Sequence, residues 1–187
     1  MDQPPSVLIA PVVADSLRLV LVLMSGLPGV GKSTIASELG RLLPAVVLSV
    51  DHIEDAMLRA GLAPSFETGV AAYEVGAAVA REQLALGHSV IADAANYMEV
   101  GRDVWRRAAR SQEALIRVVH VECSDLGAHE QRLLQRSRGL SHYPEPTWAE
   151  VEQRRLQVEP WSGAVVVVDS AEPLDATVAQ CLTFLCA

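Results

Sequence analysis

The strongest constraint on the fold is a glycine-rich segment of eight residues at 26–33. It follows an apolar run of strand length at 17–24 and overlaps a segment, 32–43, whose apolar residues recur at helical spacing. A strand, a glycine turn and a helix in this order predict a turn in which backbone N–H groups and a helix N-terminus converge. The residues concerned are Gly26, Leu27, Pro28, Gly29, Val30, Gly31, Lys32 and Ser33, followed by Thr34.

This segment matches G-x-x-x-x-G-K-[ST], the P-loop pattern, whose glycines let backbone N–H groups surround phosphate oxygens. Lys32 supplies a compact cation for the β- and γ-phosphates, and the hydroxyl of Ser33 suits Mg²⁺. We therefore expect residues 26–34 to bind ATP together with Mg²⁺. The alternative, a glycine turn without a ligand, is disfavoured because the segment lies between a predicted strand and a predicted helix.

The composition of the chain indicates that Lys32 has a specific role. The chain has 187 residues and a formal net charge of −8, and fourteen of its fifteen basic residues are arginine, so Lys32 is the only lysine. A chain that uses arginine wherever any cation suffices has a specific need for one lysine. The acidic balance disfavours a protein that binds long nucleic acid. No apolar run approaches the ~20 residues of a membrane helix.

The first residues show neither the cationic segment nor the long apolar stretch of a secretory signal. The three cysteines lack the spacing of a metal site and suit a reducing compartment. We therefore expect a cytoplasmic protein without a membrane partner. Oligomeric state is left open.

The remainder of the chain alternates between apolar strands and amphipathic helices. Strands are expected at 45–50, 89–92, 115–121 and 164–168, and helices at 52–60, 66–86, 98–110, 126–136, 147–158 and 174–185. Thr147, with Glu150 three residues later, predicts a capping box at the start of the helix at 147–158. This order predicts an α/β fold: a five-stranded parallel sheet with helices on both faces, as in P-loop NTPases. We expect one domain over 1–187, with an N-terminal tail at 1–16. Residues 137–147, with one glycine and two prolines, are expected to form a small lid.

Two aspartates follow predicted strands, and the carboxyl ends of parallel strands are where ligands bind in such sheets. Asp51 ends the second strand, which we expect beside the P-loop strand. From its position it is either a carboxylate that faces a bound ligand or an N-cap of the helix starting at His52. Asp93 ends the third strand and is expected to hold Mg²⁺ with Ser33, a helix cap being its alternative.

Two classes of P-loop protein are disfavoured. A GTPase needs a second lysine in its base-recognition motif, and this chain has none. Ring-forming ATPases place a water-activating glutamate beside the strand-end aspartate, whereas Asp93 is flanked by alanines. Of the classes of P-loop protein considered, the small kinases remain.

The motifs and their order resemble the small bacterial P-loop kinases that include chloramphenicol phosphotransferase, polynucleotide kinase and zeta toxin. The resemblance runs from about residue 19 to 185 and rests on the P-loop, on residues 49–53 and 90–93, and on the Glu-Gln-Arg-Leu-Leu-Gln-Arg segment at 130–136. It implies that Asp51, Lys32 and Arg136 are catalytic, that Arg132 stacks on adenine and that Arg138 belongs to the lid. Spacing by one helical turn predicts that Arg132 and Arg136 face the same way.

The function expected from these residues is transfer of the γ-phosphoryl of ATP to a hydroxyl of a small molecule, bound by residues 51–66, Tyr73, Asn96 and Tyr97. One alternative is a polynucleotide or nucleoside 5′-hydroxyl kinase. Polynucleotide kinase carries an arginine soon after its base, whereas the first one here is Arg59, eight positions on. Another alternative is a nucleotide-binding regulator without turnover. Contacts of His52 and Arg59 with the acceptor are left open.

A basic helical face carries four arginines interleaved with acids. We expect it to be solvated rather than to bind nucleic acid, because no aromatic residues accompany it. The four are Arg102, Arg106, Arg107 and Arg110.

Overall fold

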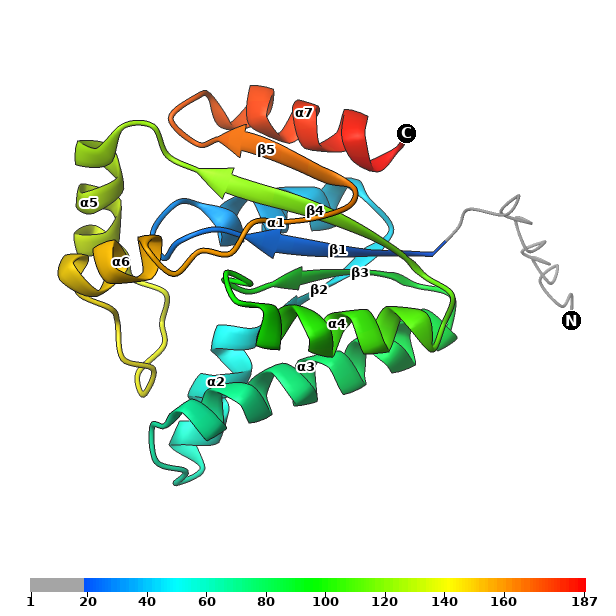
Figure 1. The fold of residues 1–187 in the computed structure, drawn as a ribbon, viewed down its shortest axis with the longest axis horizontal. Helices are drawn as coiled ribbons and strands as arrows, with labels where there is room; N and C mark the ends of the chain where they lie inside the picture. The colour runs from blue at the N-terminus through cyan, green and yellow to red at the C-terminus, as the bar shows by residue number, and fades with distance from the viewer. Residues whose placement is uncertain (1–18) are drawn as a thin grey trace, which may run out of the picture.

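The computed structural model describes residues 19–187 and contains a five-stranded sheet (Figure 1). The predicted tail at 1–16 lies outside the described residues. All strands are parallel, in the order β2-β3-β1-β4-β5, which confirms the predicted fold class. The strands are β1 (Val20–Ser25), β2 (Ala45–Ser49), β3 (Ser89–Asp93), β4 (Leu115–Glu122) and β5 (Val165–Asp169).

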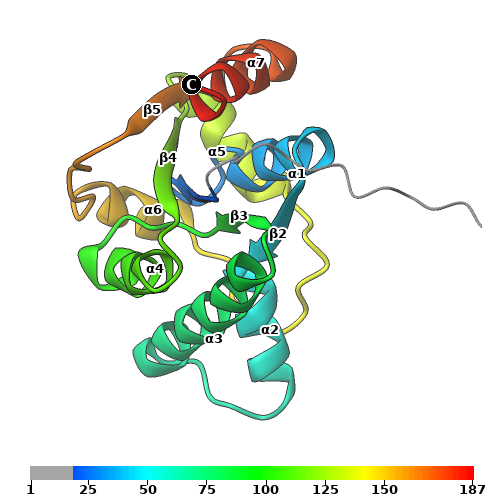
Figure 2. The same cartoon turned by 90° about the vertical axis from the view of Figure 1, so that its right-hand side faces the viewer.

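Seven helices accompany these strands in the described part of the chain. They are α1 (Lys32–Leu42), α2 (Val50–Arg59), α3 (Phe66–Ala85), α4 (Glu99–Arg110), α5 (Leu126–Gln135), α6 (Trp148–Arg155) and α7 (Leu174–Leu185). Helices α1 and α7 cover one face of the sheet, and α3 and α4 cover the other (Figure 2). Helices α5 and α6 lie beyond the carboxyl edge (Figure 1).

Two cores follow from the two-residue period of the central strand. Val22 and Met24 of β1 are buried in the core beneath α1 and α7, while Leu21 and Leu23 are buried in the core beneath α3 and α4. Because both faces are covered, β1 is apolar at almost every position, which is the pattern of a central parallel strand. The site-bearing loops therefore start from a rigid, buried strand.

The strand order corrects one expectation. Strand β3 lies between β1 and β2, so Asp51 follows a strand two positions from the P-loop strand, and Asp93 follows its neighbour. Sequence order does not determine spatial order when crossover helices connect parallel strands. Space for a ligand therefore separates the P-loop from Asp51.

Helix boundaries change the setting of two predicted site residues. Helix α2 begins at Val50 with Ser49 as its N-cap residue, so Asp51 lies in the first helical turn and the N-cap interpretation is wrong. Helix α5 ends at Gln135, and Arg136 is extended, with φ −65° and ψ 136°. The prediction that Arg132 and Arg136 share a helix face is therefore also wrong.

Helix α6 begins as its sequence predicts and ends earlier. The Thr147 hydroxyl accepts a hydrogen bond from the Glu150 N–H, and the Glu150 carboxylate accepts one from the Thr147 N–H, which confirms the predicted capping box. The helix ends at Arg155, short of the predicted residue 158. None of the helices in residues 19–187 has both the length and the apolar character needed to cross a membrane.

Candidate active site

The P-loop forms a tight turn between β1 and α1 that only glycine can make at several positions. A Cβ on Gly26 would lie 2.2 Å from the Val121 carbonyl oxygen, and the Gly26 N–H donates to the Ala95 carbonyl at 3.0 Å. Gly29 and Gly31 have φ of 86° and 98°, which side-chain-bearing residues rarely adopt. The start of the loop is therefore packed closely against β4 and hydrogen-bonded to the segment that follows β3.

Three of the predicted nucleotide-binding residues support the loop from the protein core and do not border the cavity. Gly26 makes the contacts above, and the side chains of Leu27 and Val30 are buried in the core beneath α1. His129 of α5, which sequence reasoning missed, is fully buried and hydrogen bonds through Nε2 to the Pro28 carbonyl at 2.8 Å. These residues support the loop, whereas its remaining residues border open space.

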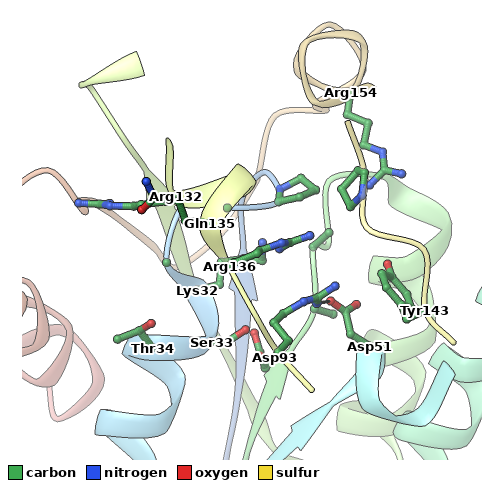
Figure 3. A pocket seen from close by; sticks show the side chains of 17 residues that line it. Lys32, Ser33, Thr34, Asp51, Asp93, Arg132, Gln135, Arg136, Tyr143 and Arg154 are labelled. Carbon is green, nitrogen blue, oxygen red and sulfur yellow. Dashed lines mark hydrogen bonds and ion pairs between the residues drawn. The ribbon is translucent and has the colours of Figure 1, made fainter. Parts of the chain in front are cut away.

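That space is a cavity of about 420 Å³ at the carboxyl edge of the sheet (Figure 3), and we call it the phosphate-loop cavity. It brings together side chains from the P-loop, from the ends of β2 and β3, and from the segment that joins α5 to α6. Its lining residues are Pro28, Gly29, Gly31, Lys32, Ser33, Thr34, Asp51, Asp93, Ala94, Ala95, Arg132, Gln135, Arg136, Arg138, Tyr143, Pro146 and Arg154.

Lys32 lies in this cavity and has a strongly perturbed pKa. Its ammonium donates to the Leu27 carbonyl at 2.8 Å. Burial lowers the pKa of Lys32 to about 8, and the negative charges of Asp93 and Asp51 oppose that shift. The site therefore holds a lysine whose charge gains stability from further negative charge nearby, such as that of a phosphate.

Ser33 and Asp93 provide two oxygen donors that face each other (Figure 3). Asp93 is buried, which raises its pKa, while the Ser33 hydroxyl and Lys32 act in the opposite direction. Across residues 19–187 no cluster of three or more His, Cys, Asp or Glu side chains could hold a metal. A pair of hard oxygen ligands fits Mg²⁺, which retains waters and binds through few protein ligands plus phosphates.

Two arginines from the segment after α5 reach into the same cavity. Arg138 forms ion pairs with Asp51 and, at 2.8 Å, with Glu145, and Arg136 pairs with Glu145 as well. The Nε of Arg136 and the Nη2 of Arg138 are buried without a hydrogen-bond partner. Buried guanidinium N–H groups require acceptors, so this arrangement fits an anion with several oxygens, as ATP is.

The predicted lid segment, 137–147, contains no helix or strand and is attached to α2. The Asp55 carboxylate accepts hydrogen bonds from the His142 and Tyr143 N–H groups at 2.8 and 2.9 Å, which lower the pKa of Asp55, the His142 bond most. Asp55 and Glu145 were not identified from the sequence. The only signal for Asp55 was its place one turn after Asp51 on the same helix face.

We expect hydrogen exchange to show that the segment 138–146 opens, and that ATP with Mg²⁺ slows its exchange, because few apolar contacts hold it. In Asp55→Ala, exchange at the His142 and Tyr143 amides should accelerate about ten- to a hundredfold, since each loses a charged acceptor worth ~1.5–3 kcal/mol. Equal protection of the segment with and without nucleotide would exclude a lid.

Arg132 points away from Arg136, toward the loop after β5. It donates to the Ser170 hydroxyl and carbonyl, both at 3.0 Å. A cavity of about 250 Å³ adjoins it, lined by Gly31, Thr34, Ile35, Arg132, Ser170, Glu172, Leu174 and Thr177. Gly31, Thr34 and Arg132 line both this cavity and the larger one, so a ligand can extend from one into the other.

A third cavity, the acceptor cavity, has a volume of about 240 Å³ and lies on the other side of Asp51. It is lined by Val50, Asp51, Glu54, Phe66, Gly69, Val70, Tyr73, Ala95, Asn96, Tyr97, Met98, Val100, Gly101, Val104, Tyr143 and Arg154. Four of these residues also line the phosphate-loop cavity: Asp51, Ala95, Tyr143 and Arg154. His52 and Arg59 line neither of the two, and His52 instead contacts the Ser49 hydroxyl through Nδ1 at 2.9 Å.

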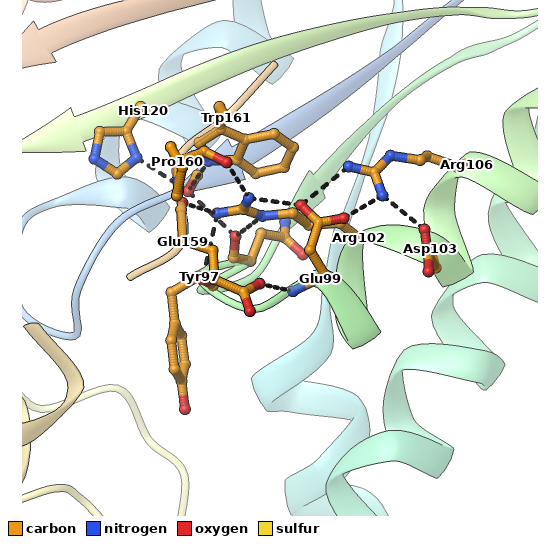
Figure 4. A network of polar contacts seen from close by, with 11 residues as sticks. Tyr97, Glu99, Arg102, Asp103, Arg106, His120, Glu159, Pro160 and Trp161 are labelled. Atoms are coloured by element: carbon orange, nitrogen blue, oxygen red, sulfur yellow. Dashed lines mark hydrogen bonds and ion pairs between the residues drawn. The ribbon is translucent and has the colours of Figure 1, made fainter. Parts of the chain in front are cut away.

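A buried arginine fixes the backbone of Asn96 and Tyr97, which line the acceptor cavity (Figure 4). Arg102 is fully buried; it donates to the carbonyls of Asn96 at 2.9 Å and Glu159 at 2.6 Å, and its guanidinium lies 3.8 Å from the Trp161 ring centroid. The prediction that the basic face of α4 is solvated is therefore wrong for Arg102. A helical charge pattern cannot show carbonyl acceptors 57 residues away.

The fold and the glycine loop define a P-loop protein with the fold of small kinases. The model of the family described as "AAA domain" matches residues 21–159, and the chain belongs to that family. No curated protein gives a significant match.

Three solved structures illustrate the similarity. A sugar kinase from Janibacter sp. HTCC2649 gives a TM-score of 0.66 at 19% identity, covering 90% of this chain and 94% of that one. The Mycobacterium tuberculosis APS kinase, in complex with AMPPNP and APS, gives 0.62 at 20% identity, covering 91% and 99%. Chaetomium thermophilum Kti12, in complex with ADP-AlF3, gives 0.63 at 19% identity, covering 88% and 98%. At these identities the similarity establishes the fold; the narrower resemblance to chloramphenicol phosphotransferase, polynucleotide kinase and zeta toxin stays a prediction.

Proposed function

We propose that this protein is an ATP- and Mg²⁺-dependent phosphotransferase that moves the γ-phosphoryl group to a hydroxyl of a small molecule. One observation carries the proposal: the phosphate-loop cavity and the acceptor cavity meet at Asp51. A donor and an acceptor bound in neighbouring cavities are brought together at a carboxylate, which is the geometry that phosphoryl transfer requires.

Each residue has a role that its surroundings support. Lys32, Arg136 and Arg138 hold the phosphate oxygens and stabilise the charge that develops during transfer. Ser33 and Asp93 would hold Mg²⁺, which would neutralise part of the phosphate charge. Asp51 orients the acceptor hydroxyl and takes its proton as the new O–P bond forms, while the bond to the bridging oxygen breaks and ADP departs with its electron pair.

A nucleotide-binding regulator without turnover is the second candidate, because the phosphate-loop cavity alone would account for nucleotide binding. The nucleoside or polynucleotide kinase is less favoured, since Arg59 does not line the acceptor cavity and the chain is acidic. Hydrolysis of ATP is disfavoured because alanines flank Asp93 where a water-activating glutamate would be expected.

The deciding experiment incubates γ-labelled ATP, Mg²⁺ and the protein with antibiotics, nucleosides, sugars, amino alcohols and oligonucleotides. We expect label in a small hydroxylated acceptor and none with Lys32→Ala. Tight ATP binding without transfer to any acceptor would favour the regulator.

The affinity for ATP should fall as the pH rises above about 8. Below that pH Lys32 is charged in the free protein, and bound phosphates raise its pKa further, so binding at higher pH requires uptake of a proton. Affinity should then decline by up to about tenfold per pH unit between pH 8 and the pKa of the complex. Calorimetry from pH 7 to 9.5 measures this, and Lys32→Ala, with weaker binding throughout, should lack the decline.

A further inference from the structure

The two cavities that meet at Asp51 differ in charge. The phosphate-loop cavity is lined by Asp51 and Asp93 and by the cations Lys32, Arg132, Arg136, Arg138 and Arg154. The acceptor cavity is lined by Asp51 and Glu54 and by Arg154 alone among lysine and arginine. Arg154 lines both cavities and so lies where they meet. The side of Asp51 facing the acceptor is therefore acidic, whereas the side facing the phosphates is basic.

Glu54 is the charged group that distinguishes the acceptor cavity. It follows Asp51 by one turn of α2, and its two carboxylate oxygens lie 3.8 and 3.9 Å from the position that a Cβ on Gly69 would take. Within residues 19–187 Glu54 has no hydrogen-bond or ion-pair partner, whereas Asp51 pairs with Arg138 and Asp55 binds two backbone N–H groups. The half-buried Glu54 carboxylate is therefore free to accept a hydrogen bond from a donor on a ligand.

The remaining walls are mostly apolar. The cavity is lined by the apolar side chains of Val50, Phe66, Val70, Met98, Val100 and Val104. Phe66 is 66% exposed. An exposed aromatic ring beside a cavity can pack against an apolar or aromatic ligand. The acceptor that these walls suit has an apolar body, which distinguishes it from a free sugar.

We propose that the acceptor is an amphipathic amino alcohol whose ammonium group binds Glu54 while its hydroxyl lies at Asp51 and its apolar body packs beside Phe66. Side chains one helical turn apart have Cβ atoms roughly 5–6 Å apart, which suits an amine and a hydroxyl on neighbouring or next-nearest carbons. Anionic acceptors are disfavoured by both carboxylates. This inference rests on the proposed phosphotransferase function.

The test uses three matched aromatic alcohols, each with a primary hydroxyl and a benzyl group: phenylalaninol, which carries the amine, N-acetylphenylalaninol, which is neutral, and 2-benzyl-3-hydroxypropanoate, which is anionic. Calorimetry in the presence of ADP and Mg²⁺ measures binding, and γ-labelled ATP measures transfer. We expect phenylalaninol to bind about tenfold more tightly than the neutral compound, because its ammonium makes a charge-assisted hydrogen bond with Glu54. The anion should bind most weakly.

Glu54→Gln removes the charge and keeps the size, so the amine should lose its advantage over the neutral compound. Glu54→Lys should make the anion the preferred ligand. Glu82→Gln is the matched control, because Glu82 is exposed on α3 and lines neither cavity; it should keep the wild-type order.

The outcomes separate this inference from the proposed function. Equal binding of the three compounds, no binding of any, or an unchanged order in Glu54→Gln would overturn the role of Glu54. Transfer to neutral alcohols without preference for the amine would keep the kinase and reject the amino alcohol. Amine-selective binding that depends on Glu54, without transfer to any acceptor, would support the binding site and reject the kinase.

Discussion

Asp51→Asn should reduce phosphoryl transfer by roughly 10²–10⁴ while leaving ATP affinity nearly unchanged. Asparagine keeps the size of the side chain and cannot take the hydroxyl proton. The fold should tolerate the change, because Asp51 is partly exposed and its ion pair with Arg138 leaves Arg138 a second partner in Glu145. Asparagine also keeps a side-chain oxygen in the place of the carboxylate, which can still accept a hydrogen bond from Arg138. Steady-state turnover and calorimetry with ATP measure the two effects separately.

Asp93→Asn provides the contrast for that experiment. Asp93 faces Ser33 at the end of β3, away from the acceptor cavity, so the substitution should weaken Mg²⁺-dependent nucleotide binding and turnover together. If Asp51→Asn transfers phosphoryl groups at the wild-type rate, Asp51 is only the partner of Arg138. If it weakens ATP binding as much as Asp93→Asn does, its role is in the nucleotide site.

Features encoded within one element or one loop could be predicted from the sequence. The continuous apolar run of β1 and the helical period of α1 predict the βα unit, and the glycines between them predict the phosphate loop. The Thr147 capping box was predicted for the same reason, since its partners are three residues apart. The placement of Asp51 and Asp93 at one edge follows from the rule that strands in a parallel sheet end together.

Features that depend on contacts between distant segments could not be predicted. The position of β3 between β1 and β2 is set by crossover connections, and no local pattern reports it. Arg102 has the same sequence context as its solvated neighbours, but carbonyls after α6 surround it. Glu54 gave no signal because an exposed-looking glutamate on a short helix is common. Only the position of Gly69 and of Arg154 shows that Glu54 borders a cavity.

The distinct directions of Arg132 and Arg136 lead to the second large prediction. Arg136 lies with Lys32 in the phosphate-loop cavity, and its buried Nε has no hydrogen-bond partner, so it can stabilise charge on the transferring group. Removing an arginine in that role costs about 10³–10⁵ in kcat. Arg136→Ala should therefore lose turnover on this scale with a small change in ATP affinity.

Arg132→Ala is the matched substitution in the same cavity. Because Arg132 is held by Ser170 beside the adjoining cavity, its loss should weaken ATP binding and leave kcat comparatively unaffected. Thermal unfolding of both variants serves as a control for stability. Glu145 keeps its ion pair with Arg138 when Arg136 is removed. If Arg136→Ala keeps kcat within tenfold of wild type, Arg136 serves to anchor Glu145 and the segment after α5, and the charge of the transferring group must be stabilised by Lys32 and Arg138 instead.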